Sequence, residues 1–397
     1  MDSTVLIGII VTLALLVVAF FTYRANSTSN DDKPIEPVKK EAPKAKENKK
    51  KEEKKEVPHK KITKEDTPLR VGAFKGHTGT VTSHAVSSDG KYAATSSEDR
   101  TIKIWEIKTL KESDIKSIHI PIPYDHATAI CFTADSRHLL VVLKEAEQVV
   151  AFKILPKKDD KGKQYQEAHR FPLDKSHAGD VKQIAASTNS KFVVTMSDDT
   201  KFNVWTIKGA LLHTVDTSSV KNNKFLITPD SRFIAVATWS SEVKLWEVLY
   251  DKEGNFKEVK KTMELFGHSS TIHSISVSAD ATKIATCSKD HSWKVYNINV
   301  KNNSPNIIFA HQGEKEGGYD HVGLSEDART VATTQGNLLT FFRHNPGNNT
   351  VDSLDTVTLL NTPLGLEWNE DQLFVYFNQG ITVFSNPNPG TKKKGKK

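Results

Sequence analysis

The sequence predicts an all-β protein built from repeated four-stranded units. The first observation is a spacing that occurs three times: a His, a Thr eighteen positions later, an Asp four after that, and an aromatic residue six further on. The three sets are His77, Thr95, Asp99 and Trp105; His177, Thr195, Asp199 and Trp205; and His268, Thr286, Asp290 and Tyr296. The second observation is the alternation of apolar and polar residues in short runs between turn residues, with no helical windows between them.

Aligning the end of the third strand places seven units along the chain. Their closing aromatic residues are Trp105, Phe152, Trp205, Trp246, Tyr296, Phe342 and Phe384. The steps of 41 to 53 residues agree with the roughly 40 to 45 residues of a propeller blade. The sequence therefore predicts a seven-bladed β-propeller over residues 66–386. The segment from Leu69 to Lys75 is expected to complete the last blade, which leaves no open sheet edge.

A His, a hydroxyl and an Asp in one set also suggest a hydrolase. A nucleophilic triad needs one activated hydroxyl at an open site, whereas these sets recur in three separate blades. We therefore interpret each set as a structural tetrad whose buried polar groups satisfy one another and fix a loop to a turn. The sequence contains no metal constellation, nucleophile elbow, kinase motifs or dinucleotide fingerprint. It predicts a protein that is not an enzyme and has no cofactor or metal.

The first residues form a separate segment. Val5 to Tyr23 is a run of nineteen residues without charge, which is long enough to span a bilayer. Asp2 precedes the run, and Tyr23-Arg24-Ala25 is a poor cleavage site, so residues 1–24 are predicted as a transmembrane signal anchor rather than a cleaved signal peptide. Arg24 and thirteen lysines between residues 33 and 64 follow it. The positive-inside rule then predicts a lumenal N-terminus and a cytosolic propeller.

Two basic segments flank the propeller. Residues 25–65 are rich in Lys, Glu and Pro and predict a disordered linker, and residues 387–397 form a basic C-terminal tail. The whole chain carries +7, of which residues 33–64 hold +7 and residues 391–397 hold +5, so the propeller itself is left near −3. This balance argues against a nucleic-acid face on the propeller. For the linker and tail, a solvated spacer and a weak contact with anionic lipid, ribosomes or RNA are both retained as interpretations.

Two hairpins are longer than a blade needs. They run from Ile154 to Pro172 and from Val248 to Met263, and each is expected to join the third and fourth strands of its blade on the same face. The candidate basic contacts on them are Lys157, Lys158, Lys161, Lys252 and Lys257. Solvated loops are the alternative interpretation.

Trp239 is the candidate partner contact. It occupies the turn of the fourth blade that holds Glu98 and Asp99 in the first, where an exposed Trp would favour binding. The alternative is that it fills the space left by the missing tetrad. Cys131 and Cys287 have neither disulfide nor metal-ligand spacing, in agreement with a reducing compartment.

The blade motifs resemble those of WD-repeat proteins, through Gly76-His77 with Ile104-Trp105-Glu106 and through Leu245-Trp246-Glu247. With the anchor, the lysine-rich spacer, the two long hairpins and the Asp125-His126-Ala127-Thr128 opening of the second blade, the chain resembles the transducin beta-like protein 2 family. That resemblance implies a place in the endoplasmic reticulum membrane, a link to the unfolded-protein response through the stress kinase PERK, and association with ribosomes or messenger RNA. It transfers no catalytic residue.

Three functional hypotheses follow. The first is a scaffold that holds cytosolic proteins at the endoplasmic reticulum. The second is a guanine-nucleotide exchange factor or adaptor for a small GTPase in vesicle traffic, although propellers of that kind carry their anchor at the C-terminal end. The third is a lumenal hydrolase, which glycosylation at Asn302 or Asn348 would support.

Overall fold

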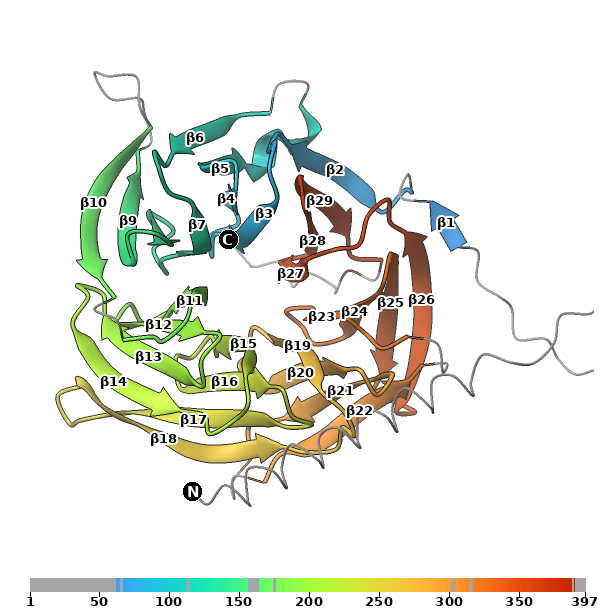
Figure 1. Cartoon of the computed structure of the whole chain (residues 1–397). Coiled ribbons are helices and arrows are strands. Elements are labelled where there is room, and N and C mark those ends of the chain that lie inside the picture. Colours follow the sequence, from blue (N-terminus) through green and yellow to red (C-terminus); the bar gives the residue numbers. More distant parts are fainter. Residues whose placement is uncertain are drawn as a thin grey trace, which may run out of the picture. The chain divides into compact units, whose positions relative to one another are not determined.

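Seven β-sheets are arranged around a central axis (Figure 1). The computed structural model describes residues 62–64, 67–112, 115–155, 164–173, 176–300, 304–313, 317–387 and 389. Within these ranges the one helix is the 3₁₀ turn η1 (Ile107–Lys111), so the predicted seven-bladed all-β propeller is confirmed. The predicted anchor at Val5 to Tyr23, residues 25–61 of the linker and residues 390–397 of the tail lie outside the described residues. Among the residues that are described, no helix has the length and hydropathy of a membrane span.

Each of the first five blades follows the chain through four antiparallel strands. Blade one holds β3 (Val81–Val86), β4 (Tyr92–Ser97), β5 (Thr101–Glu106) and β6 (Ser117–Pro121). Blade two holds β7 (Ala127–Phe132), β8 (His138–Leu143), β9 (Gln148–Ile154) and β10 (Tyr165–Pro172). Blade three holds β11 (Val181–Ala186), β12 (Phe192–Ser197), β13 (Lys201–Thr206) and β14 (Leu211–Asp216). Blade four holds β15 (Asn222–Ile227), β16 (Phe233–Thr238), β17 (Val243–Tyr250) and β18 (Phe256–Leu265). Blade five holds β19 (Ile272–Val277), β20 (Lys283–Ser288), β21 (Ser292–Asn297) and β22 (Asn306–Gln312).

Blades six and seven take strands from both ends of the described chain. Blade six holds β23 (His321–Leu324), β24 (Thr330–Gln335), β25 (Leu338–Asn345) and β26 (Thr350–Thr358). Its outer edge carries a fifth strand, β1 (Ile62–Lys64), which runs parallel to β26. Residues 62–64, predicted as part of the disordered linker, instead find backbone partners at the open edge of β26.

The ring is closed by the strand that the sequence predicted. Blade seven holds β27 (Gly365–Asn369), β28 (Gln372–Phe377) and β29 (Gly380–Ser385), and β2 (Arg70–Lys75) pairs antiparallel with β29 as its outer strand. Two further backbone bonds join the ends: Ser385 N donates to Leu69 O at 2.7 Å, and Val81 N donates to Asn378 O at 2.9 Å. The N-terminal strand thus completes the last blade.

The hydrophobic core is divided among the contacts between blades. The described residues form seven buried clusters, one between each pair of neighbouring blades. Phe74 on the closing strand has no exposed surface and stacks on Trp105 of blade one, with ring centroids 5.5 Å apart. The closing strand therefore also supplies the apolar contact between blades seven and one.

The turn between the first and second strands of a blade is formed by hydrogen bonds among residues that are close in sequence. In blade one the Ser87 hydroxyl donates to Asp89 at 2.8 Å, and the same carboxylate oxygen accepts the N–H of Lys91. Thr228 and Asp230 repeat this arrangement in blade four. A short hydroxyl–Asp pair reverses the chain by bonding its own backbone two residues on, so these sequences specify turns without tertiary help.

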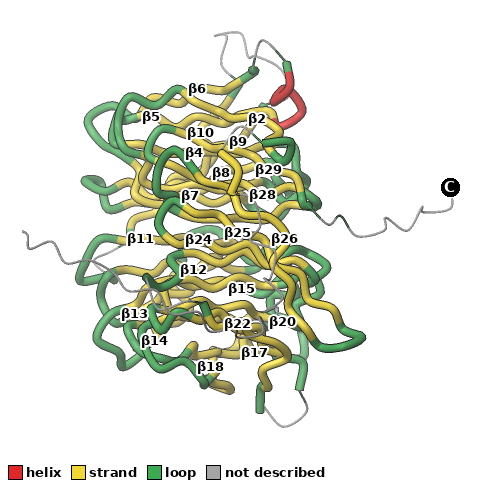
Figure 2. Tube along the Cα trace, turned by 90° about the vertical axis from the view of Figure 1, so that its right-hand side faces the viewer, coloured by secondary structure: helices red, strands yellow, loops and turns green. Residues whose placement is uncertain are grey.

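The propeller has two faces, seen edge-on in Figure 2 as loops on either side of the strands. The upper face holds the connections between blades and the turns between second and third strands. The lower face holds the turns between first and second strands and the hairpins between third and fourth strands. The predicted placement of the long hairpins is confirmed: β9 leads to β10 and β17 to β18. On the lower face, Asn189 Nδ2 donates to Tyr250 Oη at 2.7 Å, joining a blade-three turn to the β17–β18 hairpin.

Replacing Phe74 with Ala should destabilise the propeller by about 3–5 kcal/mol, because it leaves a cavity at the joint that closes the ring. Urea denaturation of the purified chain, followed by tryptophan fluorescence, measures the change. Lys75→Ala on the same strand removes an exposed side chain and should stay within about 0.5 kcal/mol of wild type. Equal effects of the two substitutions would contradict this account of closure.

Candidate functional site

The tetrad of blade one is a connected set of hydrogen bonds. Trp105 Nε1 donates to Thr95 Oγ1 at 3.3 Å, and Thr95 Oγ1 lies 2.8 Å from His77 Nε2. His77 Nδ1 lies 3.0 Å from Asp99 Oδ2. The ionised Asp99 carboxylate can only accept, so the proton of the neutral His77 is on Nδ1 and Nε2 accepts from the Thr95 hydroxyl. The set is closed and offers no free nucleophile.

The tetrads of blades three and five differ in detail. In blade three Trp205 Nε1 donates to Thr195 Oγ1 at 2.8 Å and His177 Nε2 lies 2.9 Å from that oxygen, but His177 Nδ1 is 3.4 Å from Asp199 and makes no hydrogen bond. In blade five His268 contacts Asp290 at 2.9 Å and Thr286 at 2.7 Å.

The aromatic residue of blade five acts differently from the indoles. Tyr296 is buried, and its hydroxyl donates to the backbone carbonyl of Phe266 at 2.9 Å. A phenol reaches further than an indole N–H, so it contacts the loop directly. The tetrad aromatic therefore fastens the same loop in this blade through a direct backbone contact.

Burial and hydrogen bonding set the protonation of the tetrads. Burial lowers the pKa of His77, which the Asp99 hydrogen bond only partly offsets, so the imidazole is neutral at pH 7. Burial opposes the charged form of Asp99, yet hydrogen bonds from Thr101, the Thr78 N–H and His77 hold its pKa at about 2. The carboxylate is therefore ionised, and it fastens the connection between blades to the turn before the third strand.

Blade four has no tetrad, and a lysine of its third strand holds the connection that precedes the blade. Lys244 is buried, and its Nζ donates to Thr217 O at 2.9 Å and to Ser219 Oγ at 3.2 Å. These contacts tie the connection before β15 to the third strand. Lys103, at the same position of blade one, likewise donates to Gly76 O beside an intact tetrad, so the lysine contact is common to both blades. Trp239 is largely exposed and does not fill the space of the missing tetrad.

Trp239 lies in the turn after β16 on the upper face, with 57% of its surface exposed. Its Nε1 donates to Asn223 Oδ1 at 3.0 Å, and Asn223 Nδ2 donates to Ile272 O of blade five at 2.8 Å. Lys221 Nζ lies 5.8 Å from the ring centroid. The indole is thus exposed yet held in one orientation, which reduces the entropy lost when a partner binds.

Ion pairs connect Trp239 to blade two along the upper face. Lys221 pairs with Asp198 at 3.3 Å, Asp198 with Lys182 at 3.5 Å, and Lys182 with Asp180 at 3.6 Å. Asp180 also pairs with Lys144 of blade two at 3.5 Å. These exposed pairs contribute little to stability individually. Their alternating charges give the upper face a defined polar pattern beside the exposed indole.

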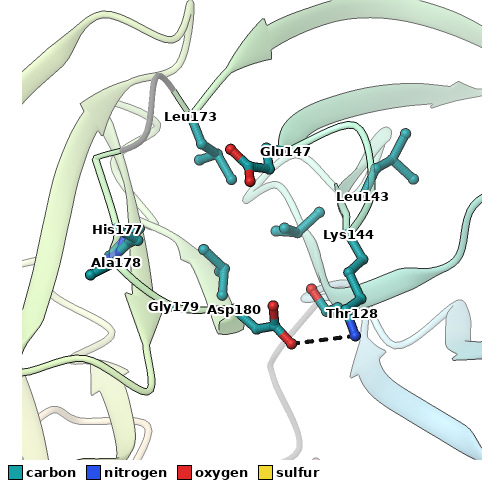
Figure 3. Close-up of a pocket in the computed structure, with 11 residues that line it drawn as sticks. Thr128, Leu143, Lys144, Glu147, Leu173, His177, Ala178, Gly179 and Asp180 are labelled. Carbon is teal, nitrogen blue, oxygen red and sulfur yellow. Dashed lines mark ion pairs between the residues drawn. The ribbon is translucent and has the colours of Figure 1, made fainter.

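A small hollow lies at the far end of these ion pairs, between blades two and three (Figure 3). It measures about 160 Å³, and Figure 3 shows Lys144 and Asp180 pointing toward one another at one side. The tetrad residue His177 lines it as well. The hollow is smaller than a drug-sized ligand site.

Exposed apolar side chains gather on the upper face. Of the eight large apolar residues that are strongly exposed among the described residues, six lie in upper-face connections: Tyr124, Val220, Trp239, Phe266, Leu360 and Leu364. Tyr124 is 90% exposed and Val220 86%. Exposed apolar groups rimmed by charge are typical of protein-binding surfaces.

The predicted basic contacts on the hairpins fall into two groups. Lys252 and Lys257 are exposed on the lower face, where Asp251, Glu253 and Glu258 accompany them, so this hairpin has mixed charge. Lys157, Lys158 and Lys161 lie outside the described residues. Lys252 and Lys257 therefore do not form a positive patch.

Sequence reasoning missed most of the upper face. The ion pairs join residues of blades two, three and four, and no fixed spacing relates them. The apolar residues in the connections carry a weak signal, since a large apolar residue in a segment between strands is a candidate for exposure. Only Trp239 was found from the sequence, because it lies in the turn that holds Glu98 and Asp99 in the first blade.

Comparison with known proteins agrees with the fold. The family model for the WD domain, G-beta repeat, matches residues 67–106 and 259–297, which include the tetrads of blades one and five. The protein is therefore a WD-repeat β-propeller.

Its relatives define the family further. Transducin beta-like protein 2 of Mus musculus is 32% identical over 356 residues, covering 87% of this chain and 79% of the relative. The Homo sapiens protein of the same name is 33% identical over 285 residues, covering 70% and 63%. Target of rapamycin complex subunit LST8 of Saccharomyces cerevisiae is 23% identical over 245 residues, covering 62% and 61%. The chain belongs to the transducin beta-like protein 2 family.

Asp99→Ala should destabilise the propeller by about 2 kcal/mol at pH 7, because it removes the ionised partner of His77 and of the Thr78 N–H. The folded-state pKa of Asp99, about 2, is below its ordinary 3.8. The stabilisation is therefore complete above about pH 4 and is lost as the pH falls toward 2. Denaturation midpoints at pH 7 and pH 2 measure this. Glu98→Ala, at the exposed neighbouring position, is the control and should change neither value; a difference between Asp99→Ala and wild type that persists undiminished at pH 2 would contradict the role of the charge.

Proposed function

We propose that the chain is a non-catalytic, membrane-anchored scaffold that presents the upper face of its propeller to cytosolic proteins at the endoplasmic reticulum. The observation that carries this proposal is the position of Trp239: exposed, fixed by Asn223, and flanked by Lys221 at the end of a series of ion pairs. Aromatic anchors within a polar surround are the usual centres of protein interfaces. The closed tetrads support a binding role, because their hydroxyls are already engaged.

The anchor and its orientation are part of the same proposal. The uncharged run from Val5 to Tyr23 and the lysines that follow it favour a single membrane span with the propeller in the cytosol. The resemblance to the transducin beta-like protein 2 family adds the endoplasmic reticulum and a role in the unfolded-protein response through PERK. A linker between the anchor and the propeller would let the upper face reach a partner that sits at the same membrane.

Trp239→Ala should abolish capture of the partner while leaving the fold intact. Truncating a central aromatic anchor costs about 2 kcal/mol or more of binding free energy, which weakens the affinity about thirtyfold. Proximity labelling from the full chain in cells, before and after induced reticulum stress, compares wild type with the variant and scores PERK among the labelled proteins.

The control for this experiment is Leu211→Ala. Leu211 is 48% exposed at the start of β14, next to a lower-face hairpin. The substitution removes a comparable apolar group from the opposite face and should leave the labelled proteins unchanged. If both variants label the same proteins as wild type, the upper face is not the docking surface. If Trp239→Ala loses labelled proteins but PERK is not among the proteins labelled by wild type, the scaffold role stands and PERK is excluded as its partner.

Asn348 tests the orientation of the propeller. It is exposed in the turn between β25 and β26 and belongs to the sequon Asn348-Asn349-Thr350, so it would accept a glycan if the propeller were lumenal. We expect no glycan in the wild-type chain, measured as the absence of a mobility shift on glycosidase treatment. A variant with an added N-terminal secretion signal that forces the propeller into the lumen is the positive control. A glycan at Asn348 in the unaltered chain would overturn the cytosolic orientation.

A further inference from the structure

A groove of about 580 Å³ lies on the rim of the propeller, between blades four and five. Figure 1 shows the outer strands of these blades, β18 and β22, at the edge of the ring. The groove is lined by the end of β18, the connection that follows it, the side chain of Tyr296 and the segment that begins β22. Trp239 does not line it, so the groove is separate from the candidate contact on the upper face.

Two strongly exposed apolar side chains lie in this one groove. Phe266 is 59% exposed and Ile307 is 43% exposed, and both line it. Met263 and Tyr296 also line it but are buried, so they form its base. Apolar surface gathered in a groove is unfavourable in water, and an apolar side chain that enters the groove removes that surface from solvent.

The connection that forms one wall of the groove is held in place. Tyr296 Oη donates to the carbonyl of Phe266 at 2.9 Å, and His268, two residues further on, is fixed by its tetrad. Gly267 lies between them with φ at +124°, and a Cβ there would be 3.1 Å from Ile307 Cδ1. The connection therefore packs directly against β22, and the groove needs little ordering when it binds.

The third strand carries a side-chain donor at one fixed position in blades one, three and four. These donors are Lys103, Asn203 and Lys244, and they bond to the carbonyls of Gly76, Ser176 and Thr217 in the connection before each blade. Lys294 occupies the same position in blade five, because it pairs with Thr286 as Lys103 pairs with Thr95. Its ammonium makes no hydrogen bond or ion pair within the described part of the chain. The phenol of Tyr296 holds the connection in this blade instead.

The side chain of Lys294 reaches the edge of the groove. The position of the Cβ that Gly267 lacks is 3.7 Å from Lys294 Cε, 3.6 Å from Tyr296 Oη and 3.1 Å from Ile307 Cδ1. Because Tyr296 and Ile307 line the groove and all three atoms lie near one point, Lys294 is their neighbour. An ammonium without a partner thus stands beside an apolar groove.

We propose that this groove binds an extended peptide segment of a partner protein, with a large apolar side chain in the groove and an acidic side chain two residues away on Lys294. Residues two apart on an extended chain point the same way and are about 6.6 Å apart, which suits the closeness of Ile307 and Lys294. Lys261, which also lines the groove, is already paired with Glu264. One unpaired ammonium therefore favours one carboxylate, and a basic segment would be repelled.

Titration of the full chain in lipid nanodiscs with the peptide acetyl-Ser-Phe-Ser-Asp-Ser-amide tests this proposal. The phenyl ring carries fluorine, binding is followed by fluorine NMR, and empty nanodiscs are subtracted. The control peptide has Asn in place of Asp. We expect the acidic peptide to bind at least about fivefold more tightly, because the carboxylate accepts a charge-assisted hydrogen bond from Lys294. Absence of binding, or equal affinity for the two peptides, would overturn the proposal.

Two variants separate the charge from the apolar contact. Lys294→Met keeps the length of the side chain and should reduce the affinity for the acidic peptide to that for the Asn peptide. Phe266→Ala should weaken both peptides by a similar factor and preserve the preference for the acid. Lys289→Met removes an exposed lysine from the upper-face turn of the same blade and should change neither affinity. A preference for the acid that survives in Lys294→Met contradicts the assignment.

Trp239→Ala distinguishes this site from the upper face. We expect it to bind both peptides as wild type does, whatever its effect on the proteins labelled in cells. Loss of peptide binding in Trp239→Ala would place the peptide on the upper face and overturn the rim site.

Photochemical crosslinking of the wild-type chain covers the case in which a variant does not fold. A benzophenone replaces the phenyl ring of the acidic peptide, and the crosslinked residues are identified by mass spectrometry. We expect them to be Met263, Phe266 and Ile307, and crosslinks confined to other residues would exclude the groove. If the peptide does not label the chain, while wild type self-associates and Phe266→Ala does not, the occupant is a second copy of the chain and the peptide assignment is wrong.

Discussion

The pairing of β2 with β29 is the constraint on which the rest of the molecule depends. Each blade buries its two faces only against its neighbours, so an open ring would expose the faces of two blades at once. The closing strand supplies the backbone partners of β29 and inserts Phe74 against Trp105. The upper face spans several blades, so its geometry is fixed only while the ring is complete.

The blades could be predicted from the sequence because their main contacts are local. His77, Thr95, Asp99 and Trp105 lie within thirty residues, and the hydrogen bonds among them require the spacing that recurs at His268 and its partners. The closing strand could be predicted because a run with strand periodicity preceded the first blade and lacked a unit of its own. In both cases the residues that make the contact, or the strand that lacks a blade, can be recognised within one short segment of the sequence.

The surfaces could not be predicted in the same way. Asp180 contacts Lys144 and Lys182, and Asp198 contacts Lys182 and Lys221, so the pattern is created when three blades are placed side by side. Blade lengths vary, and no fixed spacing relates such residues. The cavity of about 500 Å³ on the axis of the propeller has the same origin, because its lining comes from the first strands of all seven blades.

Blade four carries the candidate partner contact Trp239 although it lacks the tetrad. In blades one and five an ionised Asp occupies the turn before the third strand and points inward to a His, which commits that turn to structure. In blade four Ser240 stands at the Asp position, and Lys244 fastens the connection between blades from the third strand. Ser240 still holds the turn, because its hydroxyl accepts the N–H of Glu242 as Asp99 accepts that of Thr101. Trp239 stands at the position of Glu98, which is exposed in blade one as well. Blade four therefore differs in carrying an aromatic side chain at an already exposed position, where Asn223 fixes the orientation of the indole.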